Sequence, residues 1–183
     1  MNEPFLITGL PRTRTAWFTA LFNAIGVPCI HEWGYGFQYS KSAFHHWLGL
    51  NGPRGVCDPS MACATEQAET LELFAKCPVV LIERNSIDAQ TAFEDWIGQP
   101  TPNYGALVRN VMEFRRGLKM VKADLFEVRY EQLDDYETIR TIVRHCCGRP
   151  LPHNVWRQFD ALHIEQHLTK VRLTRQLAGY IQR

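Results

Sequence analysis

The 183-residue sequence lacks several features that define large classes of protein. No apolar run approaches the roughly 20 residues that a membrane-spanning helix needs. The first residues show no charged segment followed by an apolar one, so no secretory signal is expected. The formal net charge is only +1, which argues against a protein that coats nucleic acid. These absences predict a cytoplasmic protein with no membrane partner and no nucleic-acid partner.

The six cysteines show none of the spacings that are typical of a metal site. Zinc ligands usually occur as closely spaced pairs, and the only cluster in this chain is His145-Cys146-Cys147. Adjacent residues of a helix do not face each other. We therefore expect reduced, mostly buried thiols and no metal.

Short apolar runs alternate with helical patterns along the chain, and repeats and low-complexity tracts are absent. The expected strands cover residues 5–7, 29–30, 56–60 (a strand or a turn), 79–82 and 125–128. Residues 79–82 are entirely apolar, which is typical of a parallel strand buried on both faces. The expected helices cover residues 15–25, 65–76, 86–96, 107–119, 139–146 and 155–162. This alternation predicts one α/β domain over residues 1–183, a three-layer α/β/α structure with a mainly parallel central sheet.

Two segments depart from the alternation. Residues 33–55 are rich in glycine and aromatic side chains, and they are expected to form a long loop over the site, with one or two helical turns around residues 42–48. A loop of this length in a compact domain is usually functional. Its aromatic residues either line a pocket or fix the loop to the core. Residues 165–183 form a basic C-terminal tail.

The turn after the first strand carries the strongest local signal. Gly9 and Pro11 end the strand, and Arg12-Thr13-Arg14-Thr15 opens a helix. A helix N-terminus presents unpaired backbone N–H groups and a positive dipole end, to which arginine adds charge. A phosphate or sulfate site is predicted here, and the alternative is an ordinary turn with solvated arginines. The turn is not a Walker A loop, because that loop needs a lysine before its Ser or Thr.

Three segments of the chain resemble the PAPS-dependent sulfotransferases, in the order in which that family has them. Gly9-Leu-Pro-Arg-Thr-Arg-Thr-Ala-Trp17 resembles the 5′-phosphosulfate loop. Residues 79–93 are similar to the strand–Arg-Asp-Pro–helix segment, and Val128-Arg-Tyr-Glu-Gln-Leu133 resembles the Tyr-Glu-x-Leu signature. The resemblance implies a P-loop NTPase-like sulfotransferase fold. It also implies PAPS (3′-phosphoadenosine 5′-phosphosulfate) as co-substrate, and a small-molecule acceptor with a hydroxyl or an amine.

The resemblance implies roles for the residues of the first segment. Arg12 occupies the position of the family's catalytic lysine or arginine, which contacts the sulfonate in transfer. Thr13, Thr15 and the backbone of Arg14 and Ala16 would surround the 5′-phosphate. Arg14 replaces a glycine of the family, so its side chain either adds an anion contact or crowds the loop.

The second segment supplies the expected contacts with the 3′-phosphate. Arg84 matches the arginine that holds this phosphate in the family. The family's later serine is Ala92 in this chain, and Thr91 beside it is the candidate for the second contact.

The general base for the acceptor is expected near the end of the second strand, where the family often places His or Glu. Glu32 and His31 occupy that place, with Glu32 preferred and with His45 and His46 as the next candidates. The alternative role for Glu32 is a salt bridge with an arginine.

Two other functions are compatible with the sequence. The first is a nucleotide-dependent phosphotransferase, against which the missing Walker lysine counts. The second is a non-catalytic binding or structural module that keeps the fold.

Overall fold

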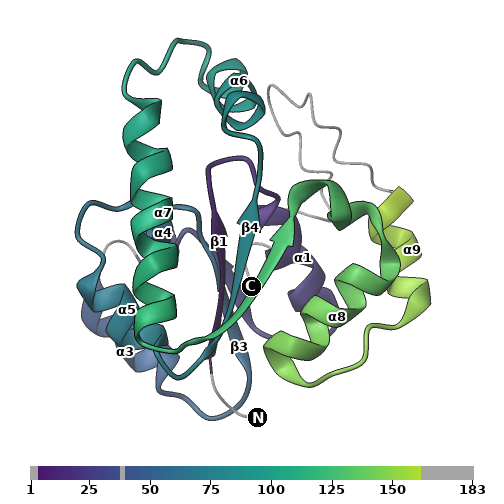
Figure 1. Ribbon diagram of the computed structural model, residues 1–183. Helices are drawn as coiled ribbons and strands as arrows, with labels where there is room; N and C mark the ends of the chain where they lie inside the picture. The colour runs from purple at the N-terminus through teal and green to yellow at the C-terminus, as the bar shows by residue number, and fades with distance from the viewer. Residues whose placement is uncertain (1–3, 38–39, 162–183) are drawn as a thin grey trace.

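A computed structural model describes residues 4–37 and 40–161, so the expected basic tail at residues 165–183 lies outside the described part of the chain. Within that part, five strands form one sheet in the order β2-β3-β1-β4-β5, and every neighbouring pair is parallel. The strands are β1 (Pro4–Gly9), β2 (Cys29–His31), β3 (Arg54–Cys57), β4 (Pro78–Glu83) and β5 (Asp124–Arg129). The predicted α/β fold with a parallel central sheet is confirmed (Figure 1).

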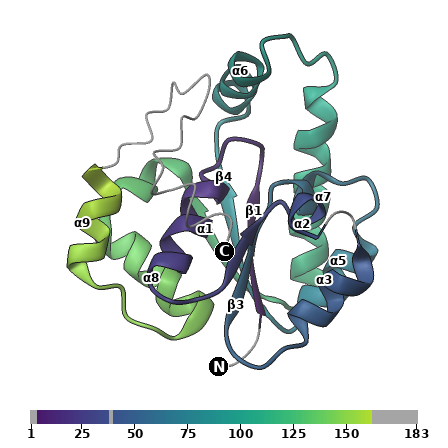
Figure 2. The same cartoon turned by 180° about the vertical axis from the view of Figure 1, so that it is seen from behind.

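Helices cover both faces of the sheet (Figures 1 and 2). One face carries α1 (Thr15–Ala24), α8 (Tyr136–Cys147) and α9 (His153–Ala161). The other face carries α2 (Trp33–Gly36), α3 (Lys41–Leu48), α4 (Ser60–Cys63), α5 (Ala68–Phe74) and α7 (Tyr104–Met120). Helix α6 (Ser86–Ile97) lies beyond the carboxyl end of β4, and the 3₁₀-helix η1 (Tyr130–Asp134) directly follows β5.

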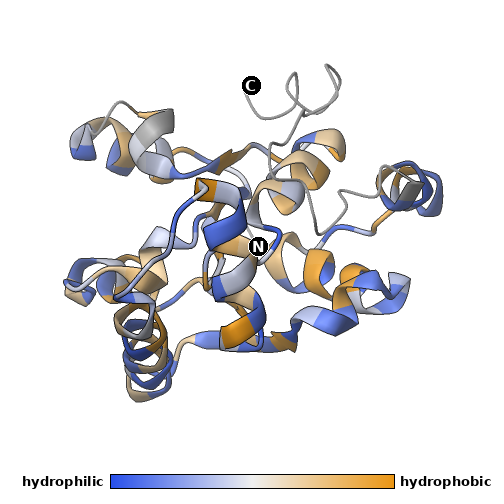
Figure 3. Cartoon of the chain, turned by 90° about the horizontal axis from the view of Figure 1, so that it is seen from above, coloured by the Kyte–Doolittle hydropathy of each residue, from blue (hydrophilic) through white to orange (hydrophobic). Residues whose placement is uncertain are grey.

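The central strand β1 joins two apolar clusters. Phe5 and Ile7 belong to the cluster on the α1 and α8 side, whereas Leu6 belongs to the cluster on the α3, α5 and α7 side. Successive residues of a strand point to opposite faces, so a strand that is covered on both faces must be apolar throughout. Seen from above, the helices on both sides combine hydrophobic and hydrophilic residues, as expected of helices between core and solvent (Figure 3).

Helix boundaries follow the local sequence signals. The Asn85 side chain accepts hydrogen bonds from the backbone N–H groups of Ile87 and Asp88 and so caps α6. Gly148 ends α8 with a φ of 68°, a left-handed conformation that glycine adopts at low cost.

Residues 33–55 are more regular than the expected loop, because they form α2 and α3 and lead into β3. The ring of Trp33 stacks on Phe44 at 5.0 Å, and the rings of Phe37 and Trp47 lie 5.6 Å apart. Phe44 is buried in the core cluster on this face of the sheet. The aromatic side chains therefore fix the segment to the core, which was one of the two roles expected for them.

No helix in the described ranges is long and apolar enough to cross a membrane. None of the six cysteines, all of which lie in the described ranges, forms a disulfide, and five of them are buried.

Candidate active site

A cavity of about 340 Å³ lies at the carboxyl edge of the sheet. Each of the five strands supplies lining residues at or just beyond its carboxyl end: Arg12, His31, Ser60, Arg84 and Tyr130. Parallel α/β sheets bind ligands at this edge. The ends of all five strands therefore converge on one cavity.

The turn between β1 and α1 is shaped mainly by its backbone. A Cβ atom on Gly9 would lie 2.5 Å from the carbonyl oxygen of Ile82, so only glycine fits between β1 and β4. The Thr13 hydroxyl donates a hydrogen bond of 2.8 Å to the carbonyl of Leu10 and closes the turn. Thr13 is fully buried, so its hydroxyl serves the turn itself.

Arg12 and Arg14 adopt left-handed backbone conformations, with φ values of 69° and 63°. This conformation costs a non-glycine residue about 1–2 kcal/mol. Arg14 stands where the sulfotransferase motif has a glycine. Glycine would adopt this conformation at lower cost. Left-handed residues that alternate with residues of negative φ turn successive backbone N–H groups toward one side, which forms a concave anion site.

The N-terminus of α1 faces the cavity. Thr15, Ala16 and Trp17 form its first turn and line the cavity, and this turn contains no acidic residue. Arg14 at the N-cap position gives no side-chain hydrogen bond to the helix. The positive end of the helix dipole is therefore directed at the cavity without compensation by a cap, which favours an anion there.

Two arginines flank the ring of Tyr130. The guanidinium of Arg84 lies 4.2 Å from the ring centroid, and that of Arg14 lies 5.1 Å from it. Arg84 also donates a hydrogen bond of 2.6 Å to the carbonyl of Arg12, which ties the end of β4 to the turn. Arg14 forms an ion pair of 2.7 Å with Asp134. The side chain of Arg14 therefore points toward η1 and does not crowd the turn.

The charges on Arg12 and Arg14 are stabilised to different degrees. Burial lowers the pKa of Arg12, and the positive charge of Arg84 adds to this effect, while Tyr130 opposes it. Burial also opposes the charge of Arg14, but Tyr130 and Asp134 outweigh it and raise the pKa of that side chain. Both arginines are protonated at neutral pH. A bound anion near Arg12 would offset the cost of burial and the repulsion by Arg84.

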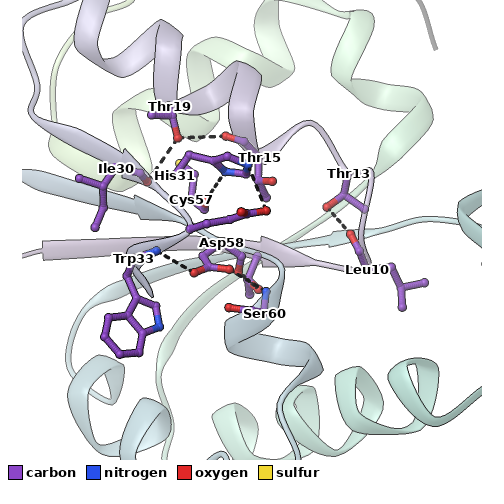
Figure 4. Close-up of polar contacts among 12 residues, drawn as sticks. Leu10, Thr13, Thr15, Thr19, Ile30, His31, Trp33, Cys57, Asp58 and Ser60 are labelled. Atoms are coloured by element: carbon purple, nitrogen blue, oxygen red, sulfur yellow. Dashed lines mark hydrogen bonds and ion pairs between the residues drawn. The ribbon is translucent and has the colours of Figure 1, made fainter. Parts of the chain in front are cut away.

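His31 and Glu32 also line the cavity, and they contact each other. His31 Nδ1 donates a hydrogen bond of 2.8 Å to the carbonyl of Cys57, and His31 Nε2 lies 3.5 Å from Glu32 Oε1 (Figure 4). Because a carbonyl only accepts, Nδ1 holds the proton of the neutral ring and Nε2 carries the lone pair. Glu32 has a φ of 52°, and strained backbone of this kind is concentrated at functional sites.

A buried carboxylate fixes this wall. Asp58 is fully buried, and its two side-chain oxygens accept hydrogen bonds from the backbone N–H groups of Trp33 at 3.0 Å and Ser60 at 2.7 Å. The Thr8 hydroxyl donates to the carbonyl of Asp58 at 2.7 Å. Asp58 therefore holds the turn that follows Glu32 against β1 and α4.

Several expected site residues lie elsewhere. Thr91 is exposed on α6 and does not line the cavity, so its contact with a phosphate stays a prediction. His45 and His46 are exposed on α3 and do not line it either. His45 instead lies 3.3 Å from Glu69.

Other cavity residues were not among the expected site residues. Phe93 and Trp96 come from one face of α6, and Leu107 comes from α7. The spacing of three between Phe93 and Trp96 places both on one side of a helix, which is the signal that could have found them. Together with Trp17 they give the cavity an aromatic wall.

The thiol of Cys63 also lines the cavity. Burial and the charge of Asp58 raise its pKa to about 12, so the thiol is protonated at neutral pH and is a poor nucleophile. Across the described residues there is no group of three or more His, Cys, Asp or Glu side chains that could hold a metal ion.

The fold, but not the sequence, matches known proteins. No protein-family model matches the chain, and no curated protein matches it. The mouse sulfotransferase SULT7A1 complexed with PAP matches at a TM-score of 0.59 and 11% identity, over 99% of this chain and 74% of that one. A gluconokinase from Sinorhizobium meliloti (TM-score 0.48, 13% identity) covers 88% of this chain and 96% of its own. A shikimate kinase from Bacteroides thetaiotaomicron (TM-score 0.47, 13% identity) covers 90% and 100%.

The likeness to the mouse sulfotransferase defines the class of fold, a P-loop-like α/β sheet with helices on both faces. At this level of identity the likeness extends to the fold alone.

Proposed function

We propose that this chain is a sulfotransferase that transfers a sulfuryl group from PAPS to a hydroxyl or amine of a small-molecule acceptor. One observation carries the proposal: a single cavity is lined by Arg12 and Arg14 of the turn after β1, by Arg84 after β4 and by the His31–Glu32 pair at the end of β2. The cavity thus combines groups that bind anions with a group that can take a proton. The sulfotransferase complexed with PAP supports the proposal through its fold.

The residues present fit a nucleotide that carries two separate phosphates. The N-terminus of α1 and the backbone of the turn would hold the 5′ end, and the buried Thr13 would contribute its backbone N–H. Arg84 would hold the 3′-phosphate, with Thr91 as the proposed second contact. The ring of Tyr130 keeps the guanidinium of Arg84 in place.

In the proposed reaction the acceptor oxygen or nitrogen forms a bond to sulfur while the bond between sulfur and the 5′-phosphate oxygen breaks. Arg12 and the positive end of α1 stabilise the negative charge that grows on the departing oxygen. The acceptor proton passes to the His31–Glu32 pair, and adenosine 3′,5′-bisphosphate (PAP) leaves. No metal ion is needed in this step.

The geometry favours His31 Nε2 as the proton acceptor, with Glu32 stabilising the imidazolium that forms. The hydrogen bond from Nδ1 to Cys57 leaves the lone pair on Nε2, and the Glu32 carboxylate lies 3.5 Å from that atom. The sequence favoured Glu32 slightly, and the structure supplies a reason to place His31 first.

Replacing His31 with glutamine is expected to lower kcat by about 10²- to 10⁴-fold, the range for loss of a general base. PAP binding should persist, because the substitution replaces none of the groups proposed to hold the phosphates. The measurement is kcat from steady-state rates with PAPS, together with the shift in Tm that PAP produces. His46→Gln on the exposed face of α3 is the matched control and should behave as wild type. A His31→Gln protein with wild-type kcat would remove the histidine from the mechanism.

A thermal shift assay tests the proposed function directly. PAP at 100 times its Kd is expected to add about 2.7 kcal/mol to the free energy of unfolding. For a chain of this size that corresponds to roughly 5–10 °C in Tm. ATP with Mg²⁺ should give a smaller shift, and Arg84→Ala should weaken the response to PAP.

Each other outcome of this assay has a distinct meaning. Stabilisation by ATP with Mg²⁺ alone would favour a phosphotransferase and contradict the proposal. Stabilisation by neither nucleotide would favour a non-catalytic module of the same fold.

A further inference from the structure

A second cavity adjoins the first one. It has a volume of about 620 Å³ and lies between α3, α4, α5 and α7. Ser60, Cys63 and Leu107 line both cavities, so the two meet along these three residues. Its volume falls within the 300–1,000 Å³ that small-molecule sites usually have. Among the contacts proposed for PAPS, Arg12, Arg84 and the first turn of α1 line the first cavity and not the second one.

The part of the second cavity next to the shared wall is mainly apolar. Trp33 and Met61 line it together with Leu107, and two of these come from elements that Asp58 holds in place. Figure 4 shows the backbone N–H groups of Trp33 and Ser60 hydrogen-bonded to the carboxylate of Asp58. A ligand that lies here would therefore place an apolar body against a wall that is fixed relative to His31 and Glu32.

The charged residues of the second cavity lie outside the shared wall. They are Lys41, Glu66 and Glu69. Lys41 and Glu69 form an ion pair of 2.6 Å, which compensates both charges. Glu66 forms no ion pair with any described residue and is exposed. The outer part of this cavity is therefore net negative, whereas Arg12, Arg14 and Arg84 make the first cavity positive.

We infer that the second cavity binds the acceptor, and that the acceptor is an amphiphilic amine with a hydroxyl at the opposite end. The inference rests on the proposed function, because the orientation of the acceptor follows from the role proposed for His31. The hydroxyl faces His31, the apolar body lies against Met61 and Leu107, and the ammonium group faces Glu66. The first cavity is positive and the outer part of the second cavity is negative. An acceptor whose far end is a carboxylate is therefore disfavoured.

Three linear probes of equal length test this inference: 8-aminooctan-1-ol, octane-1,8-diol and 8-hydroxyoctanoate. Their affinities are measured by calorimetry on the full chain, without nucleotide. The amine is expected to bind about tenfold more tightly than the carboxylate, with the diol between them, since an exposed charge pair changes affinity only a few-fold. Glu66→Gln should reduce the difference to about twofold or less.

Two further variants complete the test. Glu72→Gln, on the exposed face of the same helix as Glu69, is the matched control and should leave all three affinities unchanged. Ala68→Trp introduces a large side chain at the cavity wall and should weaken all three probes at least fivefold, while the response of Tm to PAP persists. Unchanged discrimination in E66Q, or unchanged affinities in A68W, would overturn the inference.

The outcome is separable from that of the proposed function. Probe binding that depends on Glu66, without any response to PAP, would support the second site and contradict the sulfotransferase. A response to PAP without probe binding at the second cavity would support the sulfotransferase and contradict this acceptor.

Discussion

An Arg12→Gly protein is expected to keep its fold and to lose sulfuryl transfer by about 100- to 1000-fold in kcat/KM, the loss that follows removal of one charge-stabilising donor. Arg12 lines the cavity at the turn before α1, and its pKa is lowered mainly by burial. A side chain whose charge is costly in the free protein gains most when negative charge develops beside it. The measurement is a steady-state assay with PAPS and any acceptor that supports turnover.

Glycine is the informative substitution because Arg12 has a φ of 69°. Glycine relieves about 1 kcal/mol of left-handed strain, which roughly offsets its greater entropy in the unfolded chain. Loss of activity in R12G therefore reports the guanidinium and not the backbone. Arg140→Ala is the control, because Arg140 lies on the surface of α8 and pairs with Glu137. Wild-type turnover by R12G would contradict the mechanism.

Asp58→Ala is expected to lower the free energy of unfolding by about 1–3 kcal/mol, because it removes a buried carboxylate that accepts hydrogen bonds from two part-buried backbone N–H groups. These groups belong to Trp33 and Ser60, and the carboxylate that serves them is fully buried. Asp58→Asn keeps one acceptor oxygen and should lose less. Urea unfolding measures the effect as a lower midpoint with an unchanged slope.

Asp95→Ala is the matched control for this substitution, since Asp95 is exposed on α6 and its loss should change stability by less than about 0.5 kcal/mol. Asp58→Ala should also reduce activity at temperatures where the protein stays folded, because the turn after Glu32 loses its anchor. An Asp58→Ala protein as stable as D95A would show that the two N–H groups find other partners.

The fold was largely predictable because the strands contain short apolar segments that alternate with helical patterns. Residues 79–82 form part of β4 and are buried on both faces, as their continuous apolar sequence indicates. Residues 33–55 were harder to predict, because their glycines and aromatics suggested a loop, whereas burial of Phe44 stabilises α3. Tertiary packing there overrides weak local propensity.

The candidate site was predictable only where the residues follow strand ends. Arg12, His31, Glu32 and Arg84 lie in the cavity because parallel strands bring their carboxyl ends to one edge. The orientation of Arg14 depends on Asp134, which is 120 positions away in the sequence, and no local pattern encodes such a contact. Thr91 illustrates the same limit, since the register of a helix decides which side chains reach a cavity.

The contact between Arg14 and η1 also bears on the order in which the protein folds. The turn after β1 holds two arginines in a costly backbone conformation, and Arg14 is secured by Leu133 and Asp134, which lie 119 and 120 residues later in the chain. Closing a loop of that length carries a large entropic cost, so contacts of this range form after local ones. The anion site is thus completed only when β5 has joined the sheet and η1 has formed after it. A chain that ends before η1 would contain the residues of the turn but would lack the contacts that fix Arg14.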